Sequence, residues 1–367
     1  MSRMLITGGR APIALDLART LRRAGHQVHI ADVFKTRMLD RFEQHTYASP
    51  VHAPLAFAAD VNRLNAQLRP DLIIPLCEEI FHLARLAEPT LPLYAPPIAT
   101  LMRLHSKFAF IEWANDLGLD APATERLTGP VDAGIAARSV IKPEFSRFGT
   151  RCLIKPSRHR LKHKDLSNGW LRQDYIAGED LCFYGLGQHG RLTAFAAYRS
   201  DWRAKGGASY HFQPLAPPLA GRLREIARRL IAASSLTGQI ACDLRHDADD
   251  RLWLIECNPR GTSGLHLLTH DPQALSRAFL SPDGEGLEGD TRPAGVGLAM
   301  ILYGVPEALR TRRWTQWWGD RRARDVLAGA RVAAFGDSLG YTAAAALRGQ
   351  DLAAFLTHDI ECNGWRD

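Results

Sequence analysis

The sequence predicts an α/β and α+β fold, with an N-terminal parallel sheet, a mixed core and a mainly helical C-terminal region. Three observations support this fold class. Residues 4–33 show the order strand, glycine turn, helix, strand. Residues 239–258 contain two apolar runs around an acidic turn, which predicts a β-hairpin. Residues from about 295 to 367 are rich in alanine and arginine at helical spacing. We expect three units, at residues 1–105, 106–280 and 281–367.

The N-terminal unit opens with a βαβ pattern. Gly25 ends a helix whose apolar side chains recur at helical spacing, namely Ile13, Leu17, Leu21 and Ala24. A βαβ unit nearly always builds a parallel sheet through a right-handed crossover. Apolar runs at 71–79 and 91–97 predict further strands. We therefore expect a Rossmann-like parallel sheet over residues 1–105.

The glycine turn of this unit also permits a dinucleotide-binding hypothesis. Gly8 and Gly9 follow the first strand, and Asp32 ends the second, where a ribose-binding acid could lie. The full glycine fingerprint is absent, because Ala11 and Pro12 stand where further glycines are expected. A structural turn is therefore the favoured interpretation, and a nicotinamide-dependent oxidoreductase is kept as an alternative.

The second unit alternates short strands with helices. Ser106 is a good N-cap for a helix that Gly118 ends. Residues 139–143 predict a strand before a polar loop, and residues 170–187 predict two strands around a glycine turn. An amphipathic helix at 222–236 leads into the hairpin. After about residue 280, glycines and acids indicate a loop.

Composition limits the classes of protein to consider. Of the 367 residues, 46% are hydrophobic, which is enough to build a sizeable core. The six cysteines form no CxxC pair, so a disulfide framework or a cysteine zinc site is not expected. The N-terminal apolar run is too short for a signal peptide, and no run of about 18 apolar residues predicts a membrane span. The net charge of +7 comes without a nucleic-acid motif. We expect a cytoplasmic protein that binds neither nucleic acid nor membrane.

The predicted hairpin carries the strongest functional signal. A symmetric hairpin around the acidic turn places Asp243 directly opposite Glu256, with Asn258 as the diagonal neighbour. Alternation along the second strand predicts that Glu256 and Asn258 share a face with Leu252 and Leu254. Opposed carboxylates repel each other. A hard cation such as Mg²⁺ relieves that repulsion and takes oxygen ligands, so we expect a magnesium site here. A shared proton is the alternative.

These residues resemble the metal motif of the ATP-grasp superfamily, closest to its carbamoyl-phosphate-synthase-like and carboxylate–amine ligase members. The resemblance covers about residues 1–280. It implies a pre-ATP-grasp domain, then a core of two α+β subdomains clasping ATP, with a flap at about 140–180. Lys107 resembles the first nucleotide lysine, and Lys142 resembles the second, which contacts the phosphates. A lysine is a flexible point charge suited to phosphate.

The run RQDYIAGEDL resembles the hinge that holds adenine in that family. Gln173 matches the polar residue that faces the base, and the backbone of Tyr175 and Ile176 matches the segment that bonds the base edge. Asp180 matches the acid on the ribose hydroxyls, with Glu179 as the neighbouring candidate. A carboxylate can accept hydrogen bonds from two hydroxyls.

Basic residues complete the resemblance. Lys205 resembles a residue that reaches the terminal phosphate, and Arg199 is a weaker candidate. Arg260 resembles the arginine that steadies an acyl phosphate or a tetrahedral oxyanion, for which a bidentate guanidinium is suited.

The sequence also departs from the family pattern. The loop after Lys142 is poor in glycine, so we expect donors from its polar side chains: Ser146, Arg147 and Thr150. Ala241 stands where amino acid ligases often have an arginine, which puts the acceptor geometry in doubt. A zinc site at His159 and His163 is not expected, although their spacing is helical.

The resemblance implies an ATP-dependent ligase that activates a carboxylate as an acyl phosphate and transfers it to an amine or similar nucleophile. Its cofactors would be ATP and Mg²⁺, with Mn²⁺ as a substitute. A non-catalytic ATP-binding module is a third alternative. A biotin-carboxylating subtype and a homodimer are left open.

Overall fold

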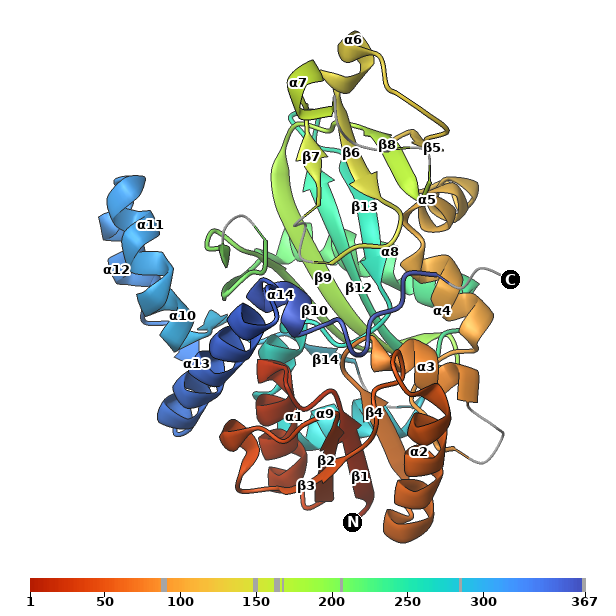
Figure 1. Cartoon of the computed structure of the whole chain (residues 1–367), viewed down its shortest axis with the longest axis vertical. Coiled ribbons are helices and arrows are strands. Elements are labelled where there is room, and N and C mark those ends of the chain that lie inside the picture. The colour runs from red at the N-terminus through yellow and green to blue at the C-terminus, as the bar shows by residue number, and fades with distance from the viewer. Residues whose placement is uncertain are drawn as a thin grey trace.

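The N-terminal βαβ pattern folds as predicted in the computed structural model of the chain (Figure 1). The structure describes residues 1–86, 91–147, 151–161, 166, 168–204, 207–283 and 286–364. A parallel sheet has the order β3-β2-β1-β4. Its strands are β1 (Arg3–Thr7), β2 (Gln27–Asp32), β3 (Glu43–Thr46) and β4 (Leu72–Pro75). The short 3-10 helix η1 (Arg37–Leu39) precedes the edge strand β3.

Two helices cover opposite faces of this sheet. Successive side chains of a strand point to opposite sides, so each face of the sheet presents apolar side chains that a helix can bury. Ile6 packs in one hydrophobic cluster with helix α1 (Pro12–Arg23). Leu5 packs in another with helix α2 (Pro54–Leu68). Helices α3 (Glu79–Leu86) and α4 (Ile98–His105) lead from the sheet towards the core.

The glycine turn after β1 is explained by packing. A Cβ atom on Gly9 would lie 2.7 Å from Ile30 Cγ2, so only glycine lets the turn approach β2 this closely. The Asp32 carboxylate, which a dinucleotide ribose would need, accepts hydrogen bonds from the backbone N–H and the guanidinium of Arg10. These contacts favour the structural interpretation of the turn.

Arg10 joins the start of the chain to its end. Its guanidinium lies between the buried carboxylates of Asp32 and Asp359, at 2.6 Å from Asp359 Oδ1. We expect Arg10→Met to lower the free energy of unfolding by about 3–5 kcal/mol, because it leaves two buried carboxylates unpaired. Denaturant unfolding would measure this. The control Arg63→Met breaks an exposed pair with Asp60 and should cost less than about 0.5 kcal/mol. Equal losses in the two variants would contradict the prediction.

The core contains two further sheets. The larger has the order β13-β12-β9-β10-β11-β15-β16, and β14 pairs with β10. Its strands are β9 (Glu179–Gln188), β10 (Arg191–Arg199), β11 (His211–Pro214), β12 (Gly238–His246), β13 (Leu252–Asn258), β14 (Leu287–Glu288), β15 (Ala294–Gly295) and β16 (Arg324–Asp325). The smaller, antiparallel sheet has the order β5-β8-β6-β7. Its strands are β5 (Thr124–Arg126), β6 (Ser139–Pro143), β7 (Leu153–Ile154) and β8 (Trp170–Asp174).

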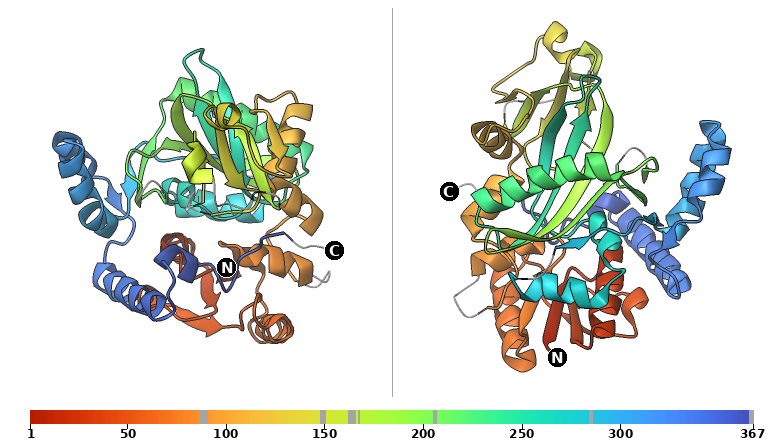
Figure 2. Two further views of the ribbon diagram at one scale, coloured as in Figure 1. Left: turned by 45° about the horizontal axis from the view of Figure 1, so that its top comes forward. Right: turned by 180° about the vertical axis from the view of Figure 1, so that it is seen from behind.

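Helices pack around these sheets. Helix α8 (Pro217–Ala233) crosses the larger sheet, as Figure 2 shows from behind, and buries Leu223, Ala227 and Leu230 against it. Helix α5 (Lys107–Asp116) buries Phe110, Ile111 and Ala114 in the same cluster. The remaining elements of this part are α6 (Ala133–Ala136), α7 (Arg158–Leu161), η3 (Ser263–Leu268) and α9 (Pro272–Leu280).

The C-terminal region is mainly helical and also adds strands β14, β15 and β16 to the core sheet. Its helices extend from one side of the molecule before the chain returns across the N-terminal part (Figures 1 and 2). They are α10 (Gly297–Leu302), α11 (Gly304–Arg310), α12 (Trp314–Asp320), α13 (Arg331–Leu347) and α14 (Leu352–Phe355). Across the described ranges, no helix has both the length and the apolar character needed to cross a membrane.

The predicted hairpin is formed by β12 and β13. Asp243 pairs directly with Glu256, which confirms the predicted register at the acids. Ile255 is an extra residue in β13, because Asp243 pairs with Glu256 while Leu244 pairs with Leu254. Such a β-bulge reverses the alternation of faces beyond it. The prediction that Glu256 shares a face with the leucines is therefore wrong.

Candidate active site

A pocket lies between the smaller sheet and the β9-β12-β13 part of the larger sheet. It brings together most of the residues that the sequence singles out, which come from positions 107 to 256. The lining includes Lys107, Lys142, Gln173, Tyr175, Ile176, Asp180, Asp243 and Glu256. Asn258 and Arg260 line an adjoining cavity of about 270 Å³ that shares Asp243 and Glu256 with the pocket. Lys205 lies outside the described residues.

Two carboxylates form the centre of the site. Cys182, Asp243 and Glu256 make one cross-strand row over β9, β12 and β13. Burial and the charge of Glu256 raise the pKa of Asp243 to about 6. Burial opposes ionisation of Glu256 too, but Lys107 and Lys142 outweigh it and lower the pKa of Glu256 to about 2. The row therefore concentrates negative charge in a partly buried place, which is the condition that attracts a cation.

Two buried lysines face these acids. Ser106 caps α5 by accepting a hydrogen bond from the Ala109 N–H at 3.0 Å, which fixes the helix start at Lys107. Lys107 Nζ lies 3.5 Å from Glu256 Oε2 and donates to the Ser146 carbonyl at 3.1 Å. Lys142 comes from β6, and burial lowers the pKa of its ammonium group. The site thus holds positive charge beside the acid row.

The predicted nucleotide hinge follows β8. Gln173 is buried and donates from Nε2 to Thr124 Oγ1 at 3.0 Å. Lys155 Nζ lies 3.9 Å from the centroid of the Tyr175 ring. Asp180 lies at the pocket wall, with its Oδ1 at 2.9 Å from Arg245 Nε. These contacts hold the hinge side chains in place beside the lysines.

The two candidate ribose acids lie in different surroundings. Asp180 lines the pocket, whereas Glu179 is outside its lining and pairs with Arg199 at 3.0 Å on the exposed surface. We expect Asp180→Asn to weaken ATP binding by about tenfold, the value of one charge-assisted hydrogen bond. Glu179→Gln is the matched control and should change affinity by less than about twofold. Calorimetric titration with ATP measures both, and equal effects would contradict the assignment.

Sequence reasoning missed two arginines of this pocket. Arg203 lies 3.7 Å from Asp180 Oδ2, and the charges of Asp180 and Asp243 help to raise the pKa of Arg203 despite its burial. Arg245 stands two residues after Asp243 on β12 and therefore points to the same face. The spacing of two residues from Asp243 could have identified Arg245 from the sequence. No sequence pattern identifies Arg203, because only the fold brings its segment to the pocket.

The loop after Lys142 brings Ser146 and Arg147 to the wall of the adjoining cavity. Arg147 lines the adjoining cavity, and its guanidinium contacts Glu78 and, at 2.9 Å, Glu361. These contacts hold the C-terminal segment against the core, and the phosphate contact of Arg147 stays a prediction. Ser146 contributes its backbone carbonyl to Lys107. Thr150 and His163 lie outside the described residues.

Arg260 lies beyond the pocket that contains the two lysines, on the wall of the adjoining cavity. Its Nη2 lies 3.3 Å from Asn258 Oδ1. It lines both the adjoining cavity and a further cavity of about 290 Å³. That further cavity lies between the core and the N-terminal unit, which contributes Arg10, Ile13 and Glu78. Neighbouring cavities in this series share lining residues, and the series runs from the lysines, past the acids, to the parallel sheet.

The fold is similar to that of ATP-grasp enzymes. No protein-family model matches the chain, and no curated protein sequence matches it. Solved structures do match it. N5-carboxyaminoimidazole synthetase from Staphylococcus aureus, complexed with ADP, is 15% identical with a TM-score of 0.64, covering 84% of this chain and 86% of that chain.

Two other similar structures are of enzymes named for other reactions. The biotin carboxylase domain of Hydrogenobacter thermophilus 2-oxoglutarate carboxylase, in complex with MgADP, ADP and bicarbonate, is 16% identical with a TM-score of 0.60. The similarity covers 77% of this chain and 70% of that chain. L-amino acid ligase from Bacillus licheniformis is 17% identical with a TM-score of 0.56, covering 76% and 74%. At these identities the likeness establishes the fold.

Proposed function

We propose that the chain is an ATP-dependent ligase that activates a carboxylate as an acyl phosphate and transfers the acyl group to an amine or similar nucleophile. The observation that carries the proposal is the acid row of Asp243 and Glu256 facing Lys107 and Lys142 in a pocket of the ATP-grasp fold. An oxidoreductase hypothesis does not account for this row, and Asp32 is already bonded to Arg10.

The donor set fits Mg²⁺. Asp243 and Glu256 offer carboxylate oxygens from paired positions, and Asn258 offers an amide oxygen two residues further along β13. Hard oxygen donors beside a phosphate site are the usual environment of this ion. Burial, and after it the charge of Glu256, raises the pKa of Asp243, and a cation beside the two acids would favour their ionised forms. When bound, Mg²⁺ would neutralise charge on the phosphate oxygens.

The protein residues would act by holding and orienting the nucleotide. Gln173 and the backbone of Tyr175 and Ile176 would bind the base edge, and Asp180 would accept hydrogen bonds from the ribose hydroxyls. Lys107 and Lys142 would hold the phosphates, and Lys205 would reach the terminal one. Phosphoryl transfer depends mostly on such positioning and charge stabilisation, so no covalent nucleophile is required.

The acceptor half of the reaction would use the cavities beyond Asn258. Arg260 would bind the substrate carboxylate and steady the acyl phosphate, since a guanidinium can contact two oxygens at once. For this, Arg260 must exchange its contact with Asn258 Oδ1 for the substrate, which frees that oxygen for the metal. The cavity against the N-terminal unit would hold the acyl group or the amine.

A coupled assay of ADP release tests this function. The panel should contain amino acids, small carboxylates and bicarbonate, each with Mg²⁺ and with or without an amine acceptor. ADP release that depends on one carboxylate supports the ligase. ATP binding without ADP release across the panel would instead support a nucleotide-binding module. Stabilisation by NADH and not by Mg-ATP in a thermal-shift measurement would support the oxidoreductase.

A further inference from the structure

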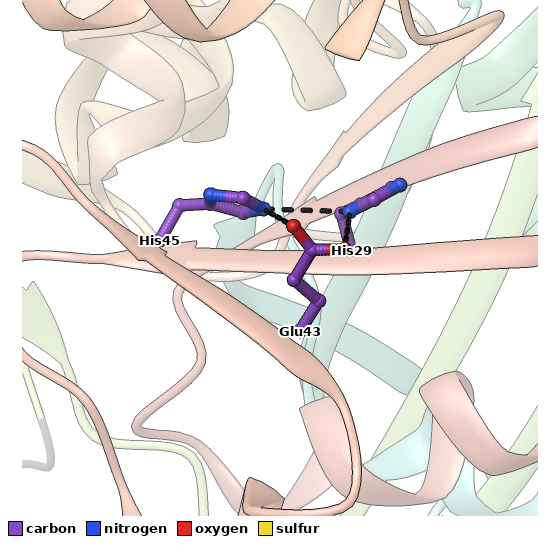
Figure 3. Close-up of side chains that lie close together, drawn as sticks. All are labelled: His29, Glu43 and His45. Atoms are coloured by element: carbon purple, nitrogen blue, oxygen red, sulfur yellow. Dashed lines mark hydrogen bonds and ion pairs between the residues drawn. The ribbon is translucent and has the colours of Figure 1, made fainter.

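Two histidines and a glutamate meet at the outer edge of the N-terminal sheet (Figure 3). His29 lies on β2, directly opposite Glu43 on the edge strand β3. His45 follows Glu43 by two residues, so both project from the same face of β3. This cluster lies outside the cavities that form the candidate active site, and the proposed ligase function does not use it.

The three side chains aim their polar atoms at one point. His29 Nδ1 lies 3.2 Å from Glu43 Oε2, His45 Nε2 lies 3.5 Å from Glu43 Oε1, and the two ring nitrogens lie 3.3 Å apart. Three such contacts would need three protons. The two ring nitrogens supply at most two, and an ionised carboxylate supplies none. Hydrogen bonds alone therefore leave at least one contact unsatisfied, whereas a cation satisfies all three lone pairs.

The donor types and spacing select the cation. Imidazole nitrogens with one carboxylate oxygen suit Zn²⁺, whereas Mg²⁺ prefers oxygen donors alone. Tetrahedral bonds of about 2.0–2.1 Å place ligand atoms roughly 3.3 Å apart. The two ring nitrogens, 3.3 Å apart, agree with that geometry, and they lie 3.2 and 3.5 Å from different oxygens of the Glu43 carboxylate. An octahedral facial site, as in non-haem iron enzymes, would bring them to roughly 3.0 Å at similar bond lengths.

Burial and access also fit a metal site. The His29 side chain is 6% exposed and that of His45 is 19% exposed, while Glu43 is 62% exposed. The histidines are thus held by the fold, and the glutamate side is open for metal entry and for a water molecule as fourth ligand. Lys35 and Arg63 place positive charge near His45, so we expect moderate affinity.

We propose that His29, Glu43 and His45 form a Zn²⁺ site that fastens the edge strand β3 to β2. Strand β3 has only four residues and pairs on one side only. A cross-strand metal link would hold it in register and would occupy side chains near an otherwise exposed sheet edge.

Zinc titration of the full chain tests the site. The protein is stripped with a chelator and titrated calorimetrically with Zn²⁺ in excess Mg²⁺, so that the proposed ATP site does not contribute. We expect one Zn²⁺ per chain, and at least about tenfold weaker binding in His45→Asn and in Glu43→Gln. His189→Asn is the matched control, because His189 is exposed and asparagine tolerates its positive φ of 49°. It should bind Zn²⁺ like the unmodified chain.

Cobalt substitution distinguishes this site from the free cysteines. Co²⁺ at the proposed site should give the intense visible bands of tetrahedral nitrogen and oxygen ligation, without the near-ultraviolet band of a thiolate ligand. Glu43→Gln changes an exposed side chain, so an unchanged unfolding midpoint of its metal-free form shows that any loss of binding is local. Unaltered Zn²⁺ affinity in His45→Asn, a thiolate band, or no binding at one equivalent would overturn the proposal.

Discussion

Glu256→Gln should reduce ADP formation by at least about 100-fold, once a carboxylate substrate is known. The loss is expected because glutamine removes an oxygen of the proposed metal site and the counter-charge of Lys107, whose Nζ lies 3.5 Å from Glu256 Oε2. Removing one preorganised electrostatic group from an active site typically costs this much in kcat. Steady-state rates at saturating Mg-ATP measure the effect. Asp243→Asn should behave similarly, since Asp243 pairs directly with Glu256.

Glu288→Gln is the matched control for this loss. Glu288 lies on β14, is half-exposed and pairs with Arg224 away from the pocket, so its rate should stay within about twofold of the unmodified chain. ATP affinity should be measured in each variant as well, because a change in binding alone would appear in KM and not in kcat. Full ADP formation in both Glu256→Gln and Asp243→Asn would refute the metal assignment.

Gly178→Ala should damage both the fold and nucleotide binding. Gly178 has a φ of +150°, and a Cβ atom there would lie 2.1 Å from the His246 carbonyl oxygen. The contact is with the backbone of β12, which cannot rotate away as a side chain could. The backbone strain alone costs about 1–3 kcal/mol. We expect the midpoint of thermal unfolding to fall by roughly 5 °C or more.

The position of Gly178 explains the second effect. It stands between the hinge residue Ile176 and the pocket acid Asp180, and its carbonyl accepts a hydrogen bond from Arg245 at 2.7 Å. Displacing this segment by about 1 Å is enough to lose roughly 100-fold in a positioned reaction. Calorimetry with ATP at a temperature where the variant is folded separates this loss from instability.

Gly221→Ala provides the control for Gly178→Ala. Gly221 lies in α8, and a Cβ atom there meets nothing within 4 Å. Alanine is the better helix former, so stability should rise by about 0.5–1 kcal/mol with ATP affinity unchanged. Wild-type stability and ATP affinity in Gly178→Ala would show that the hinge tolerates a side chain at that position.

Features set by local sequence could be predicted most fully. The N-terminal βαβ unit and the helix that Ser106 caps appear as expected, because helical periodicity and capping act within a few residues. The opposition of Asp243 and Glu256 was also predictable, since a short turn fixes the register of a hairpin. The orientation of the leucines was not, because nothing in the local pattern marks Ile255 as a bulge.

Contacts between distant segments were decided only by tertiary structure. Asp180 meets Arg245 because β9 pairs with β12, and no local pattern specifies that pairing. Arg147 is bound by Glu361, which lies more than two hundred positions later in the chain.

The proposed Zn²⁺ site also depends on contacts that the local sequence does not specify. A search by spacing considers His159 and His163 on one predicted helix. The histidines that converge, His29 and His45, lie on separate strands, which are brought side by side by the parallel pairing of β2 and β3. The sequence by itself thus determined the element types and the acid pair of the hairpin. The tertiary structure decided which side chains meet, because pairing of distant strands depends on burial of the whole core and not on local propensity.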